Sequence, residues 1–292
     1  MTDNVHITFI HGLANKPAPA DMRRIWLEAL AKPINGDGGF DPEAVGVSTS
    51  FVYWADLFYD TPLPTAQYES RENGLEQAVA TDLSSIPDDW LAAMRKHFPD
   101  NEIAYPDAPT DESTLGYERI PLPGFVKRRI MEHFLREAHD YLFDVNGIRG
   151  TIRDRVLASV PADSRCVLVG HSQGSFIAYD VLNCVAACPQ MTGLLTLGSP
   201  LGVDEIQDRL NWSRDNGFPA KLQGDWVNVY DPFDMVARLD PRLANDFCKN
   251  GKEMVIDVEE ENWGTWRHSA TKYLQGVLLR QHLRRLCGRG IA

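Results

Sequence analysis

Residues 165–174 read RCVLVGHSQG, and this stretch decides the fold. Its apolar first half is typical of a buried strand. The Gly-x-Ser-x-Gly that follows is typical of an abrupt turn from strand to helix that exposes the central serine. Such a turn leaves almost no room for side chains at Gly170 and Gly174. Residues 176–182 have apolar side chains at helical spacing and no helix breaker. The stretch therefore predicts a strand, a strained turn with Ser172 as a nucleophile, and a helix.

Length, composition and charge limit the class of protein. The chain has 292 residues, of which 43% are hydrophobic, and a formal net charge of −12. This length suits a single α/β domain over 1–292, with or without an insertion. The negative charge disfavours nucleic acid and anionic membrane surfaces as partners, because both require clustered Lys and Arg. No stretch approaches the roughly 18 apolar residues of a membrane span, and the N-terminus has no basic, apolar leader. We therefore expect a cytoplasmic protein without an integral membrane segment.

The cysteines predict neither disulfides nor a metal centre. Their number, 5, is odd in a chain of this length, which favours free thiols over a disulfide framework. Cys184 and Cys188 are four residues apart on a predicted helix, but no set of His or Cys residues accompanies them. We interpret both as small residues that pack the helix. The sequence predicts no cofactor and no metal.

Apolar runs alternate with helical segments along most of the chain. This alternation predicts a mostly parallel central sheet with helices on both faces. Besides the strand before Ser172, the expected strands are 5–10, 45–54, 193–197, 226–230 and 254–258. The expected helices are 21–30, 73–83, 88–97, 125–142, 148–160 and 270–286.

The character of the sequence changes from about 56 to 123. This segment holds 8 of the 18 prolines, and its acidic residues far outnumber its basic ones. We interpret it as an acidic, Pro-rich insertion within the domain, a possible lid that covers the mouth of the Ser172 site and selects substrates. The alternative is an acidic excursion into solvent.

Ser172 needs a base, because a serine hydroxyl at its ordinary pKa is a poor nucleophile. After a Gly-x-Ser-x-Gly turn of this kind, the acid and then the histidine follow the serine along the chain. Only His268 and His282 lie beyond Ser172. His282 falls inside the predicted terminal helix among arginines, where a surface or interface role is ordinary. His268 lies in the loop 262–269, between the last strand and the last helix, and we predict it as the base.

The loop after the strand 226–230 offers two carboxylates for the acid. Asp231 precedes a proline, where an Asx turn can occupy its carboxylate. Asp234 is followed by apolar residues, so it lies where the loop re-enters the core and where a buried carboxylate would face the base. We favour Asp234, with Asp231 as the alternative and Asp204, after the preceding strand, as a third candidate.

The oxyanion that develops during acyl transfer needs backbone N–H donors. We expect one donor from Gln173, the residue after the nucleophile. The second is expected from the loop after the first strand, where a glycine lets the backbone approach the substrate. There we favour the N–H of Leu13, with Gly12 as the alternative. His11 is interpreted as a residue that packs this loop rather than as a base.

Five short motifs occur along the chain: His-Gly at 11–12, G-H-S-x-G at 170–174, L-G-S-P-L at 197–201, D-x-x-D-x-V at 231–236 and His-Ser at 268–269. Together they resemble the α/β-hydrolase superfamily, in particular its lipase-like and esterase-like members. The run Gly-Ser-Pro at 198–200 resembles a segment of the lipase-like members, and we interpret it as a tight turn without a chemical role.

The resemblance covers about 5–54 and 165–292. It implies that Ser172, Asp234 and His268 act as a catalytic triad. The first predicted strand leads directly to His-Gly, so the two antiparallel strands that usually begin this fold are expected to be missing.

The resemblance also implies hydrolysis of a small-molecule carboxylic ester through an acyl-enzyme. Aromatic residues between 51 and 59 gather at the C-terminal end of a predicted strand, where open α/β sheets bind ligands. They favour an apolar acyl group, unless they only pack the core. One alternative is an acyltransferase, thioesterase or amidase with the same triad. Another is a catalytically silent fold whose acidic insertion binds a basic protein.

Overall fold

The computed structural model describes residues 4–34, 36–72, 88–89, 92, 136–213, 216–264 and 266–289. Within these residues the central sheet has 6 strands in the order β2-β1-β3-β4-β5-β8, and neighbouring strands are parallel throughout. The predicted α/β class with a parallel sheet is confirmed. The strands are β1 (Val5–Ile10), β2 (Val47–Val52), β3 (Arg165–His171), β4 (Met191–Leu197), β5 (Leu222–Tyr230) and β8 (Val255–Glu259).

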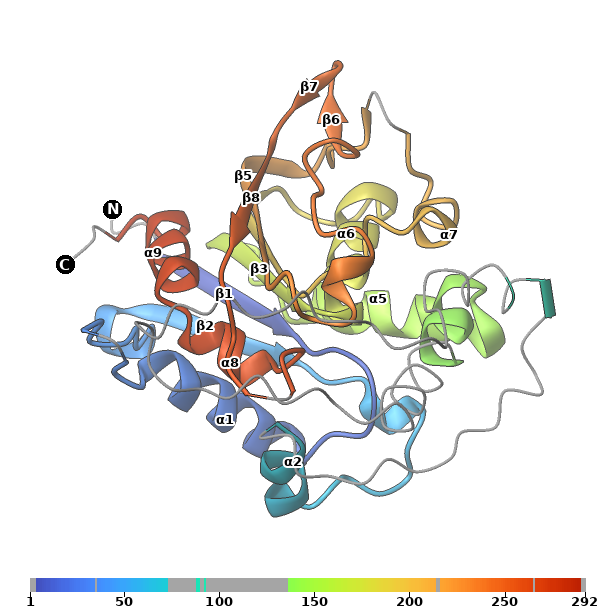
Figure 1. The fold of residues 1–292 in the computed structure, drawn as a ribbon. Helices are drawn as coiled ribbons and strands as arrows, with labels where there is room; N and C mark the ends of the chain where they lie inside the picture. Colours follow the sequence, from blue (N-terminus) through green and yellow to red (C-terminus); the bar gives the residue numbers. More distant parts are fainter. Residues whose placement is uncertain are drawn as a thin grey trace, which may run out of the picture.

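Helices cover both faces of this sheet, as Figure 1 shows. The first face carries α1 (Pro19–Ala31), α8 (Ala270–Gln275) and α9 (Val277–Leu286). The second face carries α5 (Ile148–Ala158) and α6 (Gln173–Cys184). The shorter elements are α2 (Thr65–Glu72), α7 (Asp204–Gln207) and the hairpin of β6 (Cys248–Lys249) and β7 (Lys252–Glu253).

The core lies in two layers, one on each side of the sheet. Successive side chains of a strand point to opposite faces. Accordingly Val167 and Val169 of β3 pack with α1, α8 and α9, whereas Cys166 and Leu168 pack with α5 and α6. A strand that is buried on both faces needs a continuous apolar run, which is what the sequence before Ser172 has.

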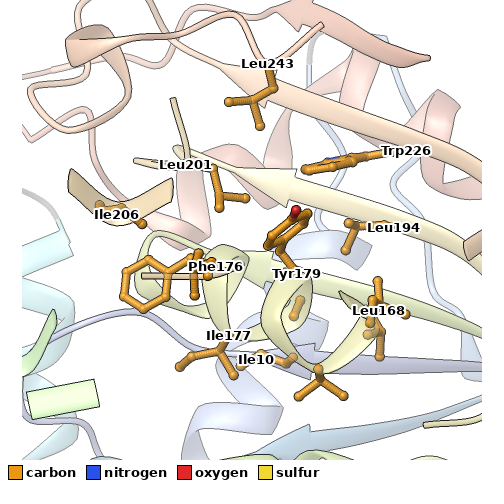
Figure 2. Close-up of a cluster of buried hydrophobic side chains, with 14 of the residues drawn as sticks. Ile10, Leu168, Phe176, Ile177, Tyr179, Leu194, Leu201, Ile206, Trp226 and Leu243 are labelled. Atoms are coloured by element: carbon orange, nitrogen blue, oxygen red, sulfur yellow. The ribbon is translucent and has the colours of Figure 1, made fainter. Parts of the chain in front are cut away.

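Helix α6 is buried along most of its length, from Gln173 to Leu182. In Figure 2, Tyr179 of this helix lies beside Leu194 of β4 and Trp226 of β5, and its ring centre is 5.7 Å from that of Trp226. Burying a side chain of this size contributes roughly 1.5–3 kcal/mol. Tyr179 therefore anchors the middle of α6 in the core.

The terminal helix predicted over 270–286 is broken in the structure. Gly276 is extended, with φ −60° and ψ 134°, and separates α8 from α9. The Glu260 carboxylate accepts the N–H groups of Leu278 and Leu279 at 2.7 and 2.9 Å, so it caps the start of α9. A Cβ at Gly276 would lie 2.2 Å from an oxygen of Glu260. The break follows from a residue distant in sequence, which helical periodicity does not report.

Part of the predicted insertion lies outside the described residues. Of the segment 56–123, the structure describes 56–72, which include α2, together with 88–89 and 92. The predicted helices 73–83 and 88–97 and the first part of 125–142 fall almost wholly outside, and residues 136–142 are helical. The predicted lid is therefore a prediction about residues that are mostly not described.

All 5 cysteines are free thiols, as predicted. Cys188 is buried and Cys184 is half-buried. In the described part of the chain, no helix has both the length and the apolar character needed to cross a membrane.

Candidate active site

The predicted turn between strand and helix is present at Ser172. Strand β3 ends at His171 and α6 begins at Gln173, which leaves Ser172 between them with φ 53° and ψ −123°. A positive φ is costly for a residue with a side chain, so this backbone is strained. The N–H of Ser172 donates to the carbonyl of Leu197 at 2.9 Å, which ties the turn to the end of β4.

Three glycines allow the backbone to crowd around this turn. A Cβ at Gly170 would lie 2.4 Å from the carbonyl oxygen of Gly174, and one at Gly174 would lie 2.2 Å from that of Ile10. A Cβ at Gly12 would lie 2.7 Å from the Cβ of Ser172. The loop after β1 therefore runs directly against the serine.

The structure brings Ser172, His268 and Asp234 into one hydrogen-bonded row. His268 Nε2 lies 2.8 Å from Ser172 Oγ, and His268 Nδ1 lies 2.7 Å from Asp234 Oδ2. All three residues are buried. An ionised carboxylate can only accept, so Nδ1 carries the proton and Nε2 is free to accept from the serine hydroxyl. This geometry can move a proton from serine to histidine.

Each member of the row comes from the end of a different strand. The serine follows β3, Asp234 follows β5, and His268 lies between β8 and α8. The sequence resembles that of proteins with the α/β-hydrolase fold. In this fold a serine on the strained turn after a central strand is followed along the chain by an acid and then a histidine. The row lies outside the carboxyl ends of the strands, where open α/β sheets bind ligands.

The two candidate carboxylates have different hydrogen-bond partners in the structure. Asp234 Oδ1 accepts the N–H of Val236 at 2.8 Å, while its Oδ2 faces the histidine. Asp231 faces elsewhere: its Oδ1 accepts the N–H of Phe233 at 2.7 Å, which is an Asx turn, and its Oδ2 accepts from Arg267 Nη1 at 2.9 Å. Burial raises the pKa of Asp231 to about 6, against the opposing effect of Arg267.

The ion pair of Asp231 and Arg267 holds the loop that carries His268. Asp231 Oδ2 also accepts the N–H of Asn262 at 2.8 Å, and the Asn262 side chain donates to the carbonyl of Arg267 at 2.7 Å. Lys272 Nζ donates to the carbonyls of residues 263 and 266, both at 2.7 Å, and burial lowers the pKa of this lysine to about 8. The side chains of Asp231, Asn262 and Lys272 therefore all hold this loop in place.

The remaining candidates for acid and base lie apart from the row. Asp204 begins α7 and is exposed. His282 lies on α9, where its Nδ1 accepts from Arg285 at 3.2 Å. Neither makes a contact with Ser172 or His268 among the described residues.

The two residues expected to donate N–H groups to an oxyanion belong to segments beside the serine: Gln173 follows it in the chain, and Leu13 follows Gly12, which packs against it. In the described part of the chain, neither the N–H of Gln173 nor that of Leu13 has a hydrogen-bond acceptor. The neighbouring Ala14 has a positive φ of 69°, and its N–H donates to both carboxylate oxygens of Glu137, at 2.8 and 3.1 Å. The Gln173 side chain donates to the Glu137 carbonyl at 3.3 Å. Glu137 thus connects the two sides of the candidate oxyanion site, and no local motif in the sequence signals it.

Two buried histidines beside the row pack the site. His11 Nδ1 donates to the carbonyl of Gly12 at 2.7 Å, its Nε2 accepts the N–H of Trp54 at 3.0 Å, and the Trp54 ring stacks on it at 4.5 Å. His171 lies 4.7 Å from the His268 ring, centre to centre. Burial lowers the pKa of both His11 and His171 well below its ordinary value. Both are therefore neutral.

Sequence reasoning also missed two residues that contact the loops of the row. The Glu72 carboxylate, at the end of α2, accepts from the hydroxyl of Ser269 at 2.5 Å, directly after His268. Tyr273 of α8 donates its hydroxyl to Asp234 Oδ2 at 2.7 Å. Neither has a sequence signal, because both contacts join distant segments. Among the described residues, no three His, Cys, Asp or Glu side chains gather in a way that could hold a metal ion.

The chain matches no protein-family model and no curated protein sequence. A solved structure similar to it is a dienelactone hydrolase from Anabaena variabilis ATCC 29413, with 10% identity and a TM-score of 0.39 over 98% of this chain and 86% of that one. Another is an uncharacterized protein from Pseudomonas aeruginosa, with 10% identity and a TM-score of 0.32 over 99% of this chain. The present chain spans 49% of that second protein. Both similarities are remote.

Proposed function

We propose that the chain is a serine hydrolase that cleaves a small-molecule carboxylic ester through an acyl-enzyme. The observation that carries this proposal is the row from Ser172 Oγ through His268 to Asp234 Oδ2, with distances of 2.8 and 2.7 Å. The row begins at a strained turn against which the loop after β1 is closely packed. Strain of this kind is typical of functional sites.

In the first half of the reaction, Ser172 Oγ attacks the carbonyl carbon of the ester while His268 Nε2 takes the hydroxyl proton. Asp234 keeps Nδ1 protonated and stabilises the imidazolium that forms. The carbonyl oxygen becomes an oxyanion, which accepts from the N–H groups of Gln173 and Leu13, with Gly12 as the alternative second donor. The carbon–oxygen bond to the alcohol then breaks. The alcohol leaves with the proton from His268, and the acyl group stays on the serine.

In the second half, a water molecule replaces the alcohol. His268 Nε2 takes a proton from the water as its oxygen attacks the acyl carbon, and the same N–H groups hold the second oxyanion. The bond to Ser172 breaks, and the histidine returns the proton to the serine oxygen. The products are the carboxylic acid and the free enzyme.

The test uses a fluorophosphonate probe, which reacts covalently with an activated serine, together with a chromogenic acetyl ester. Ser172→Ala is expected to lose labelling and to keep less than roughly 1% of the wild-type rate, because removing a triad member usually costs far more than a hundredfold. Ser159→Ala is the matched control, since that hydroxyl donates to the Arg155 carbonyl at the end of α5. Labelling of Ser172→Ala would refute the proposal.

A panel of esters of graded acyl length, with a matched thioester and amide, identifies the bond that is cleaved. Turnover of the ester above the thioester and the amide supports the proposal. A preference for the thioester or the amide would leave the row in place as the site and change the substrate class.

A further inference from the structure

The hydroxyl of Tyr273 joins the two carboxylate-bearing turns of the loop after β5. It donates to Asp234 Oδ2 at 2.7 Å and accepts the backbone N–H of Asp231 at 2.9 Å. The side chain comes from α8 and is buried. Burial, with the charges of Asp234 and Asp231 adding to it, raises the pKa of Tyr273 well above its ordinary value. The phenol therefore stays protonated and keeps donating.

The donors around Asp234 determine where its carboxylate points. Oδ1 accepts the backbone N–H groups of Val236 and Ala237, at 2.8 and 3.3 Å. Oδ2 accepts from His268 Nδ1 and from the Tyr273 hydroxyl, both at 2.7 Å. Among the described residues, backbone donors thus hold one oxygen, while the oxygen that faces the histidine has one further donor, the side chain of Tyr273. Without the phenol, the imidazole alone would hold Oδ2.

Gly198 makes room for this arrangement. Its φ is +54°, and a Cβ there would lie 2.8 Å from Asp234 Oδ2, 3.0 Å from the Tyr273 ring and 3.1 Å from His268 Nδ1. Its N–H donates to the carbonyl of Val229 at 3.0 Å, which keeps its backbone in place. The Gly-Ser-Pro turn therefore has a role that its sequence alone does not reveal: its glycine leaves the space in which three side chains meet.

We propose that Tyr273 is a positioning residue for the reaction, which acts through Asp234 by holding Oδ2 toward His268 Nδ1. This inference rests on the proposed function. A charge-assisted hydrogen bond from the phenol stabilises the charge of the carboxylate and holds Oδ2 beside His268 Nδ1. In the described part of the chain the Tyr273 hydroxyl has no hydrogen bond with Ser172, so we expect its loss to affect the proton transfer and not the binding of substrate.

The first test is Tyr273→Phe, which keeps the ring and removes the hydroxyl. We expect kcat to fall by about tenfold to a hundredfold, the range for a hydrogen bond to a charged group, with KM nearly unchanged. Tyr179→Phe is the matched control, because that tyrosine is equally buried and its hydroxyl donates to the Gly217 carbonyl at 2.9 Å. It should lose stability to a similar extent and keep the wild-type kcat.

A double-mutant cycle with Asp234→Asn separates positioning from a purely structural role. If Tyr273 acts through the carboxylate, Tyr273→Phe adds little to the loss already caused by Asp234→Asn. A structural role predicts that the two losses multiply, and that outcome overturns the inference. A folded Tyr273→Phe enzyme with kcat within twofold of wild type overturns it as well.

A second measurement covers the case in which Tyr273→Phe does not fold. Fluorinated tyrosines placed at 273 keep the hydroxyl and grade its strength as a donor. A kcat that changes with the degree of fluorination supports the inference, and a constant kcat refutes it. Failure of the proposed function has a different signature, because Ser172→Ala would then keep the wild-type rate whatever residue stands at 273.

Discussion

Replacing Gly174 by alanine tests the packing on which the site depends. The added carbon would lie 2.2 Å from the carbonyl oxygen of Ile10 and 2.8 Å from that of His11, whereas real Cβ atoms essentially never approach another heavy atom within 3.0 Å. Both oxygens belong to the backbone, so β1 and α6 must move apart. Overpacking of this kind costs typically about 1–3 kcal/mol, and the helix propensity of alanine offsets at most about 1 kcal/mol. Because a 2.2 Å approach to backbone belongs at the upper end of that range, about 2–3 kcal/mol, we expect a net loss of about 1–2 kcal/mol in the free energy of unfolding.

Gly150 is the matched control. It also lies in a helix, in α5, but a Cβ there would have no heavy atom within 4 Å. Gly150→Ala should therefore leave stability unchanged or raise it by about 0.5–1 kcal/mol, because alanine loses less backbone entropy than glycine. The same substitution thus has opposite expected signs in two helices of one protein.

Urea denaturation of both variants, followed by circular dichroism, measures the two effects. Initial rates with an acetyl ester are measured on the same variants. The residues that Gly174 contacts, Ile10 and His11, lead directly into the loop of Gly12 and Leu13. We therefore expect kcat of Gly174→Ala to fall as well. If Gly174→Ala unfolds at the same urea concentration as wild type, β1 and α6 do not approach as closely as the structure has them. The reasoning about the crowded turn would then be wrong.

Two further comparisons test the assignments of base and acid by steady-state kinetics with the same ester. His268→Ala should lower kcat by on the order of 10³-fold or more, whereas His282→Ala on α9 should be nearly silent, and the reverse pattern would make His282 the base. Asp234→Asn should lower kcat by on the order of 10³- to 10⁴-fold with little change in KM, because the carboxylate orients the imidazole and does not hold substrate. Asp231→Asn should mainly lower the urea concentration at the midpoint of unfolding, since it leaves the buried Arg267 without the carboxylate that pairs with it. A larger loss of kcat in Asp231→Asn than in Asp234→Asn would make Asp231 the catalytic acid.

The features that the sequence predicted correctly are those that depend on neighbouring residues. The apolar run before Ser172 forms a strand buried on both faces, and the glycines at 170 and 174 permit the turn because each lacks a side chain where another backbone passes. The apolar runs of strands and the periodicity of helices likewise depend on residues close in the chain, so their alternation predicted the parallel α/β class.

Which residues surround the row of Ser172, His268 and Asp234 depends on the tertiary structure. Asp231 and Asp234 are the same residue type in one short loop, and only the positions of Arg267 and His268 show which carboxylate meets which of these side chains. Glu137 is a further case, because it reaches the loop after β1 from a segment 123 residues away.

Sequence by itself determined the strand and the strained turn that carries Ser172, since steric crowding at glycine and alternating burial act between residues close in the chain. Which side chains face that serine was decided by the order and register of the strands. The sheet brings the ends of β3, β5 and β8 to one edge, and there a tyrosine from α8 meets Asp234 across 39 positions of the chain. A hydrogen bond requires its two atoms to lie about 3 Å apart, and no local pattern records that distance between segments that meet only when the chain folds.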